Sequence, residues 1–195
     1  MASVNPHPEP ALLFFSLLGP SPQSLDAVCE RLGGEPLFGR VIMRSAIIPF
    51  SHSRYYEREM GSNLLRQWAL TDRLIGQEEI IACKLRSNEI EDDPQSAIRN
   101  PQSTIDPTGR TVNIDPGYLN FAKVVLATTK DYSHRLYLGR GIYAEVTLAW
   151  HSKARGYEPW PWTYPDHREP DALDFFSQAR EEYKRLLANA RQTTY

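Results

Sequence analysis

The sequence predicts an α+β fold with a ferredoxin-like βαββαβ core, in which helices cover one face of an antiparallel sheet. The main observation is that apolar or β-branched runs alternate with runs whose apolar residues recur at helical spacing. The composition agrees, because 195 residues with 41% hydrophobic and 24% charged side chains suit one globular domain. We expect residues 1–10 to be disordered, 11–191 to form a single α+β domain and 192–195 to be a tail.

The first half of the core is marked by an apolar run and a capping sequence. Residues 11–18 are apolar, but the run is too short to cross a bilayer and no basic signal-peptide segment precedes it, so we expect a buried strand. Ser21-Pro22 is typical of an N-cap followed by the first helical position, and Gly33-Gly34 ends the helix. A second strand is expected over residues 40–48.

The second half of the core repeats this order. In residues 64–70 successive side chains fall on two alternating faces, which predicts a strand, and residues 77–88 are expected to form a helix. Residues 92–109 are rich in proline and aspartate and predict a long polar loop. Residues 110–114 are the fourth strand, which ends in a turn that begins at Asp115.

An added hairpin is expected after the core. Residues 118–128 fit either a helix or a strand, and the helix is favoured. Residues 134–150 predict a hairpin closed by the three-residue loop Gly139-Arg140-Gly141. The register that separates the two faces pairs the following residues: Leu138 with Ile142, Leu136 with Ala144, His134 with Val146, Tyr137 with Tyr143, and Arg135 with Glu145.

The C-terminal part combines an aromatic segment with a helix. The prolines of residues 151–170 argue against a regular strand there. Trp160, Trp162 and Tyr164 either close over a pocket or cover a sheet edge, and we favour the edge. Residues 171–191 carry one apolar stripe and predict a helix packed on the body.

Composition and missing motifs narrow the function classes. The net charge is −2, so no overall positive field indicates nucleic acid or an acidic membrane as partner. Cys29 and Cys83 lie far apart among apolar neighbours, which predicts buried, reduced thiols in a cytoplasmic protein. The sequence has no P-loop, dinucleotide-binding glycine motif, serine-nucleophile elbow or zinc-ligand pattern, and the aromatic pattern of an RNA-recognition module is missing.

Candidate site residues gather near the ends of the predicted strands. Asn113 and Asp115 leave the same strand face, although Asp115 is equally suited to accept backbone N–H bonds in its own turn. Arg135 and Glu145 form either a structural salt bridge or an anion clamp beside a general base. The candidate catalytic residues are Asp115, Arg135 and Glu145, and the candidate ligand-binding residues are Tyr55, Lys84, Asn88, Arg110, Asn113 and Lys123.

These residue types favour a small anionic compound, such as a nucleotide or another phosphate ester, bound by a carrier or an enzyme with its polar site on the sheet. If a metal takes part, oxygen ligands such as Asp115 and Glu145 suit Mg²⁺ better than Zn²⁺. The rival interpretations are a non-catalytic interaction module that uses the aromatic 157–166 loop, and an RNA-binding module. The sequence does not decide the oligomeric state.

Several strings also resemble an uncharacterised prokaryotic family catalogued as domain of unknown function 4416. The hallmark is Asp115-Pro116-Gly117, and the other strings lie within residues 55–61, 84–91, 134–148 and 162–166. The resemblance implies a bacterial protein and supports treating residues 11–190 as one unit. It implies no activity, substrate or cofactor.

Overall fold

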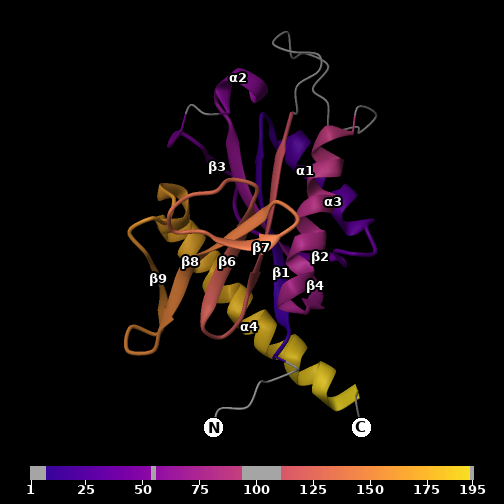
Figure 1. The fold of residues 1–195 in the computed structure, drawn as a ribbon, viewed down its shortest axis with the longest axis vertical. Helices are drawn as coiled ribbons and strands as arrows, with labels where there is room; N and C mark the ends of the chain where they lie inside the picture. Colours follow the sequence, from indigo (N-terminus) through magenta and orange to yellow (C-terminus); the bar gives the residue numbers. More distant parts are fainter. Residues whose placement is uncertain (1–7, 54–55, 94–110, 194–195) are drawn as a thin grey trace.

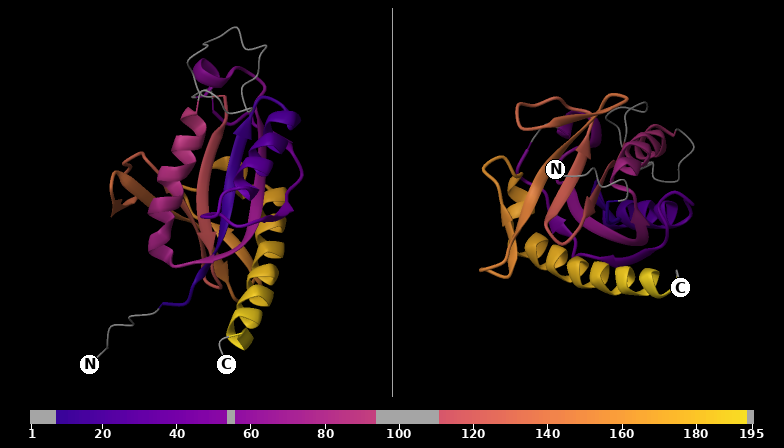
Figure 2. Two further views of the ribbon diagram at one scale, coloured as in Figure 1. Left: turned by 90° about the vertical axis from the view of Figure 1, so that its right-hand side faces the viewer. Right: turned by 60° about the horizontal axis from the view of Figure 1, so that its bottom comes forward.

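A nine-stranded antiparallel sheet separates two layers of helices (Figures 1 and 2). The computed structural model describes residues 8–53, 56–93 and 111–193. The strands are β1 (Ala11–Gly19), β2 (Val41–Arg44), β3 (Ile48–Pro49), β4 (Leu65–Ile75), β5 (Asn113–Leu119), β6 (Lys123–Thr128), β7 (Leu136–Gly139), β8 (Ile142–His151) and β9 (Gly156–Pro159). The helices are α1 (Pro22–Gly33), α2 (Glu57–Met60), α3 (Ile80–Asp92) and α4 (Pro170–Thr193), with the 3-10 turns η1 (Gln77–Glu79) and η2 (Pro165–Arg168).

The strands follow the order β2-β4-β1-β5-β6-β8-β7, while β3 also pairs with β4 and β9 with β8. Helices α1 and α3 pack on one face of this sheet, and α4 packs on the opposite face (Figure 2). The fold is therefore α+β, as predicted, with helices on both faces of the sheet. None of the described helices is long and apolar enough to cross a membrane.

Strand β1 is buried on both faces because its alternate side chains enter two different cores. Leu13 and Phe15 pack with residues of α1 and α3, whereas Leu12 and Phe14 pack with residues of α4. This position between two helical layers explains why the sequence shows a continuous apolar run rather than alternation. The predicted buried strand is confirmed.

Helix α1 begins at the predicted cap. The Ser21 hydroxyl accepts a hydrogen bond from the Ser24 amide at 3.2 Å, the Ser24 hydroxyl accepts one from the Ser21 amide, and Pro22 occupies the first turn. This reciprocal pair satisfies two amide groups that the helix itself leaves without partners.

Several other elements of the core differ from prediction in their limits. The strand expected over residues 40–48 is two short strands, β2 and β3, which both pair with β4. The third strand extends to Ile75, and the second helix starts as η1 and continues as α3. Most of the loop predicted over residues 92–109 lies outside the described residues.

The turn expected at Asp115 is wrong, because β5 runs through Asp115, Pro116 and Gly117 to Leu119. A Cβ atom on Gly117 would lie 2.3 Å from the ring of Phe14 and 2.5 Å from the Val125 carbonyl oxygen. The glycine is therefore required by the close packing of neighbouring strands, not by a turn.

The helix favoured for residues 118–128 is also wrong, because that segment contains the end of β5 and all of β6. The Asn120 side chain accepts hydrogen bonds from the amides of Ala122 and Lys123 and stabilises the turn between the strands. Pairing of β6 with β5 and β8 decides the conformation, and no such long-range pairing can be recognised in a local pattern.

The predicted hairpin is present with a changed loop. Leu136 pairs with Ala144 and Tyr137 with Tyr143, as predicted. A bulge then places Gly139, instead of Leu138, opposite Ile142. The strands are joined through Arg140 and Gly141, both with positive φ.

Two C-terminal predictions have opposite outcomes. The expectation that the proline-rich segment holds no regular strand is wrong, because β9 pairs with β8 and meets its proline only at the last position, Pro159. Helix α4 is confirmed, and it buries Phe175, Phe176 and Tyr183 against the sheet.

Cys29 and Cys83 are both buried and form no disulfide, as predicted.

Candidate functional site

The sheet divides between β5 and β6, and a cavity lies at the division. These two strands pair only from Gly117–Leu126 to Leu119–Val124. Beyond Gly117, β5 continues beside β1 to Asn113, while β6 continues beside β8 to Thr128. Pro116 lies next to the last pair, Gly117–Leu126. Because proline has no amide hydrogen to donate, it cannot extend this ladder as a donor. We call this division the fork.

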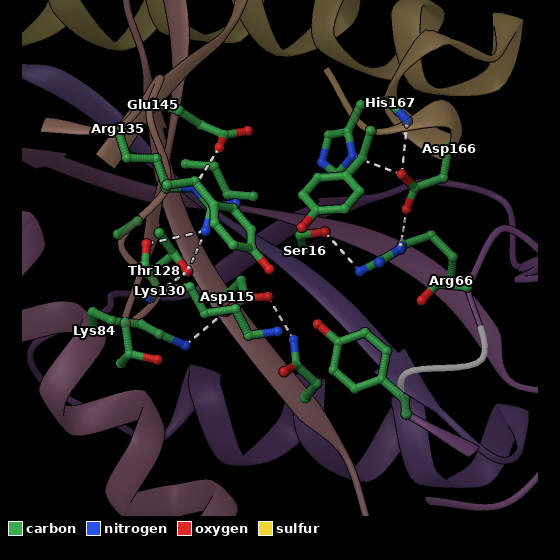
Figure 3. A pocket seen from close by; sticks show the side chains of 18 of the residues that line it. Ser16, Arg66, Lys84, Asp115, Thr128, Lys130, Arg135, Glu145, Asp166 and His167 are labelled. Atoms are coloured by element: carbon green, nitrogen blue, oxygen red, sulfur yellow. Dashed lines mark hydrogen bonds and ion pairs between the residues drawn. The ribbon is translucent and has the colours of Figure 1, made fainter. Parts of the chain in front are cut away.

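The cavity in the fork has a volume of about 400 Å³. Its lining includes four cationic side chains, Arg66, Lys84, Lys130 and Arg135, and three carboxylates, Asp115, Glu145 and Asp166. Figure 3 shows the Arg135–Glu145 pair on one side of the cavity and the Arg66–Asp166 pair on the other. Asp115 lies between them, and Lys84 lies below the Arg135–Glu145 side and points towards Asp115.

The structure brings most of the predicted site residues together. Asp115, Arg135 and Glu145 all line the cavity, and so do Lys84, Asn88 and Asn113. Lys123 does not line it, because it pairs with Ala149 at the opposite end of β6. Tyr55 and Arg110 lie outside the described residues.

Asp115 is held by two side chains from different elements. Its Oδ1 lies 2.7 Å from Lys84 Nζ of α3, and its Oδ2 accepts a hydrogen bond from Asn113 Nδ2. The suggestion that Asp115 accepts hydrogen bonds in its own turn is therefore wrong. Burial would raise the pKa of Asp115, but Lys84, Asn113 and Arg66 together outweigh burial and hold that pKa below its usual value.

Lys84 is itself almost fully buried and joins α3 to β5. Besides Asp115, its ammonium donates to the Ile114 carbonyl oxygen at 3.2 Å and lies 3.8 Å from Glu91 Oε1. Glu91 Oε1 in turn accepts the Ile114 amide at 2.6 Å. The helix thus supplies both a cation and an anion to one stretch of β5, which fixes Asp115 at the cavity.

Arg135 and Glu145 form the predicted ion pair, with 2.7 Å between Arg135 Nε and Glu145 Oε2. Arg135 precedes β7, and its guanidinium also donates to the Lys130 carbonyl oxygen and lies over the Tyr132 ring. Burial would lower the pKa of Arg135, but the contacts with Glu145 and Tyr164 together outweigh burial and raise that pKa.

His134 does not pair with Val146, where the predicted register placed it. Its Nε2 lies 3.0 Å from Glu145 Oε2, and its ring stacks on Trp162. The predicted register failed here because β7 begins only at Leu136, so His134 has no ladder partner to hold it opposite Val146.

Arg66, Asp166 and His167 form a group that the sequence did not reveal. Arg66 Nε lies 2.8 Å from Asp166 Oδ2, and its Nη1 donates to the Ser16 hydroxyl at 2.8 Å. Trp68 Nε1 donates to His167 Nε2 at 3.3 Å. An indole N–H can only donate, so the proton of His167 belongs on Nδ1, 3.1 Å from Asp166.

Both ring nitrogens of His167 are therefore engaged, and the ring positions Asp166. Burial would raise the pKa of Asp166, but the contacts with His167 and Arg66 hold it well below its usual value. One signal for this group was visible: Arg66 is a charged residue in an otherwise buried strand and needs a partner. Its partner is 100 residues away in the sequence (166 − 66), and no local pattern connects them.

The aromatic 157–166 segment serves both of the roles considered for it. Trp162 Nε1 donates to the Val146 carbonyl oxygen at 3.0 Å, so this ring covers the edge of β8 between β7 and β9. Tyr164 instead lines the cavity, as do Tyr132 and Phe50. Among the described residues, no group of three or more His, Cys, Asp or Glu side chains is arranged to hold a metal ion.

Comparison with known proteins identifies a family for this chain. A family model described as domain of unknown function (DUF4416) matches residues 9–183. No curated protein and no solved structure matches the chain.

Proposed function

The chain belongs to the family described as domain of unknown function (DUF4416), and we propose that this member binds a small anionic compound, such as a nucleotide or another phosphate ester, in the fork. The observation that carries the proposal is the concentration of charge at the cavity. Its lining has four cationic side chains and three carboxylates, hence a balance of +1, in a chain whose net charge is −2. Such a local excess attracts anions and orients them.

Size and lining support a whole small molecule rather than a single ion. The volume of about 400 Å³ lies in the range of sites that hold small organic ligands. Phe50, Tyr132 and Tyr164 add apolar surface beside the charges. A nucleobase or another planar group can stack on such rings, while a phosphate contacts the cations.

Three ion pairs also support the proposal, because they hold cations of the cavity in place before an anion binds. Lys84, Arg66 and Arg135 are each held by a carboxylate from another part of the chain. Cations that are already fixed lose little conformational freedom when an anion binds. If the bound compound is chemically changed, Glu145 and Asp115 are the side chains we assign to proton transfer, with Arg135 as the clamp on the anion.

Binding is tested by isothermal titration calorimetry with ATP, AMP and ribose 5-phosphate. Lys130→Gln removes a cation from the cavity lining, and Lys123→Gln makes the same change at the other end of β6. We expect Lys130→Gln to weaken the binding of the tightest compound by roughly three- to tenfold, and Lys123→Gln to leave it unchanged. Equal affinities in both variants, or no heat with any of the compounds, would contradict the proposal.

We further infer that residues 11–119 form a ferredoxin-like core. The order β2-β4-β1-β5, with every neighbouring pair antiparallel, supports this inference, as does the packing of α1 and α3 on one face. In that arrangement the site lies where the added strands β6 to β9 join the core at β5.

A second candidate function is a protein-interaction module, as the sequence also allowed. It is favoured by the apolar side chains exposed on β7 and the aromatic segment, among them Leu136 at 74%, Tyr137 at 62% and Trp160 at 41%. A protein partner of this surface is expected to lose affinity with Leu136→Asp and to keep it with Lys130→Gln. The opposite pattern would assign that partner to the fork.

A further inference from the structure

Within the described residues, one carboxylate oxygen of Glu145 has no hydrogen-bond donor. Its side chain is 1% exposed, in the middle of β8, and it lines the cavity. Oε2 is contacted by Arg135 Nε at 2.7 Å and by His134 Nε2 at 3.0 Å. Oε1 is buried and has no hydrogen-bond partner within the described parts of the chain. A buried oxygen without a donor costs stability unless something else supplies the hydrogen bond.

The missing donor is expected to be electrically neutral. Arg135 already compensates the charge of Glu145, and a second cation would be repelled by Arg135. The cavity lining as a whole also carries more cations than carboxylates. A hydroxyl group or a neutral N–H donates to a carboxylate without adding positive charge.

A compound that donates to the buried Oε1 of Glu145 requires a small rotation of this carboxylate towards the cavity, and it can then reach the other charges of the lining as well. Glu145 and Arg66 belong to the lining of the same cavity and lie on opposite sides of it in Figure 3. Arg66 uses Nε for Asp166 and Nη1 for Ser16 and the Leu17 carbonyl oxygen. Asp115 lies between these two sides, and the ammonium of Lys84 contacts it. A molecule that fills this space has therefore both an acceptor and cations to contact.

We propose that the ligand of the fork is a hydroxylated phosphate ester, of the sugar phosphate or nucleoside phosphate class, and that Glu145 accepts a hydrogen bond from one of its hydroxyl groups. The proposal rests on the function proposed above and assigns the substrate class of the same site. Glu145 is in this view the residue that distinguishes a polyol phosphate from an alkyl phosphate.

A matched pair of compounds tests this preference with the unmodified protein. Ribose 5-phosphate and n-pentyl phosphate both carry five carbons and one phosphate, but only the sugar has hydroxyl groups. Calorimetry is expected to show at least about tenfold tighter binding of ribose 5-phosphate, the effect of a hydrogen bond to a charged acceptor.

Glu145→Gln tests whether Glu145 is the acceptor. Arg135 requires an oxygen, so the amide oxygen of Gln is expected to face Arg135 and its NH₂ group the cavity. The acceptor is then replaced by a donor, and the preference for ribose 5-phosphate should fall to about twofold or less. Glu158→Gln is the control, because Glu158 is exposed on β9 and does not line the cavity. It should keep the full preference.

The outcomes separate this proposal from the proposed function. If both compounds bind equally to the unmodified protein, the hydroxyl proposal is overturned while anion binding stands. If neither binds, anion binding itself fails. If Glu145→Gln keeps the preference, another residue is the acceptor and the proposal is overturned. Should that variant not fold, a crystal structure of the unmodified protein with ribose 5-phosphate decides: a hydroxyl within about 3 Å of Glu145 Oε1 supports the proposal, and its absence there overturns it.

Discussion

At the scale of single residues, the site consists of buried charges whose partners come from other elements. Lys84 of α3 pairs with Asp115 of β5, and Arg66 of β4 pairs with Asp166 of η2. Such pairs add little net stability when complete, but removal of one partner leaves a buried charge without compensation. Their main effect is to fix the cavity-lining groups in position.

These pairs give stability a pH dependence whose sign follows from the lowered pKa of Asp166. The contribution of its carboxylate is fully present above the unfolded pKa of about 3.9 and is lost as pH falls through the lower folded value. We expect the free energy of unfolding to fall below about pH 4, and to fall less steeply in Asp166→Asn. Urea denaturation between about pH 6 and pH 2 measures both slopes.

The matched control is Glu181→Gln, because Glu181 is 69% exposed on α4. It should reproduce the slope of the unmodified protein. Parallel curves for Asp166→Asn and the unmodified protein would show that the buried pair does not contribute in this pH range.

At this scale, the sequence indicates the site residues more readily than the contacts between them. Asp115, Lys84, Arg135 and Glu145 were identified because charged or turn-forming residues beside apolar runs are conspicuous. Only Arg135 and Glu145 were identified as partners, because a hairpin register relates residues close in sequence. The pairing of Lys84 with Asp115 depends on how α3 packs on β5. No local pattern in the sequence indicates that packing.

At the scale of elements, β5 shows how one local signal can have two physical causes. Asp, Pro and Gly together usually indicate a turn because of their backbone preferences. Here Gly117 is needed for the close approach of Phe14 on β1, and Pro116 lies at the fork. The strand over residues 11–18, the cap at Ser21 and the hairpin were predictable because their signals are local.

Gly117→Ala tests the packing explanation. The added methyl group would overlap Phe14 and the Val125 carbonyl oxygen, so we expect the free energy of unfolding to fall by about 1–3 kcal/mol, the usual effect of overpacking. Gly156→Ala is the control, because the nearest atom to its added Cβ lies 4.0 Å away. Chemical denaturation that finds both variants equally stable would disprove the need for glycine at position 117.

At the scale of the whole molecule, α4 links the site to the hydrophobic core that it forms with the sheet. Phe176 packs edge-on against Phe14 of β1, and its ring stacks on His167 at 6.2 Å between centroids. The turn η2, which carries Asp166 and His167, runs directly into this helix. The amphipathic stripe predicted the helix and its docking, but the contact of Phe176 with His167 depends on the assembled fold.

Phe176→Ala is expected to lower the free energy of unfolding by about 3–5 kcal/mol, because it removes a fully buried ring from this core. Leu136→Ala, at a side chain 74% exposed, should change it by less than about 0.5 kcal/mol. Urea denaturation followed by circular dichroism compares them. A small effect of Phe176→Ala would mean that α4 is not part of the cooperative unit.

The fork has a mechanical consequence. Within the sheet, β2, β4, β1 and β5 are joined to β6, β8 and β7 through three residue pairs between β5 and β6. A compound in the cavity contacts side chains from both groups of strands, so it adds non-covalent links across the narrowest part of the sheet. Binding of the proposed ligand would therefore resist shear between these two groups of strands, and the anchor points for that resistance would be the charged side chains proposed to contact it.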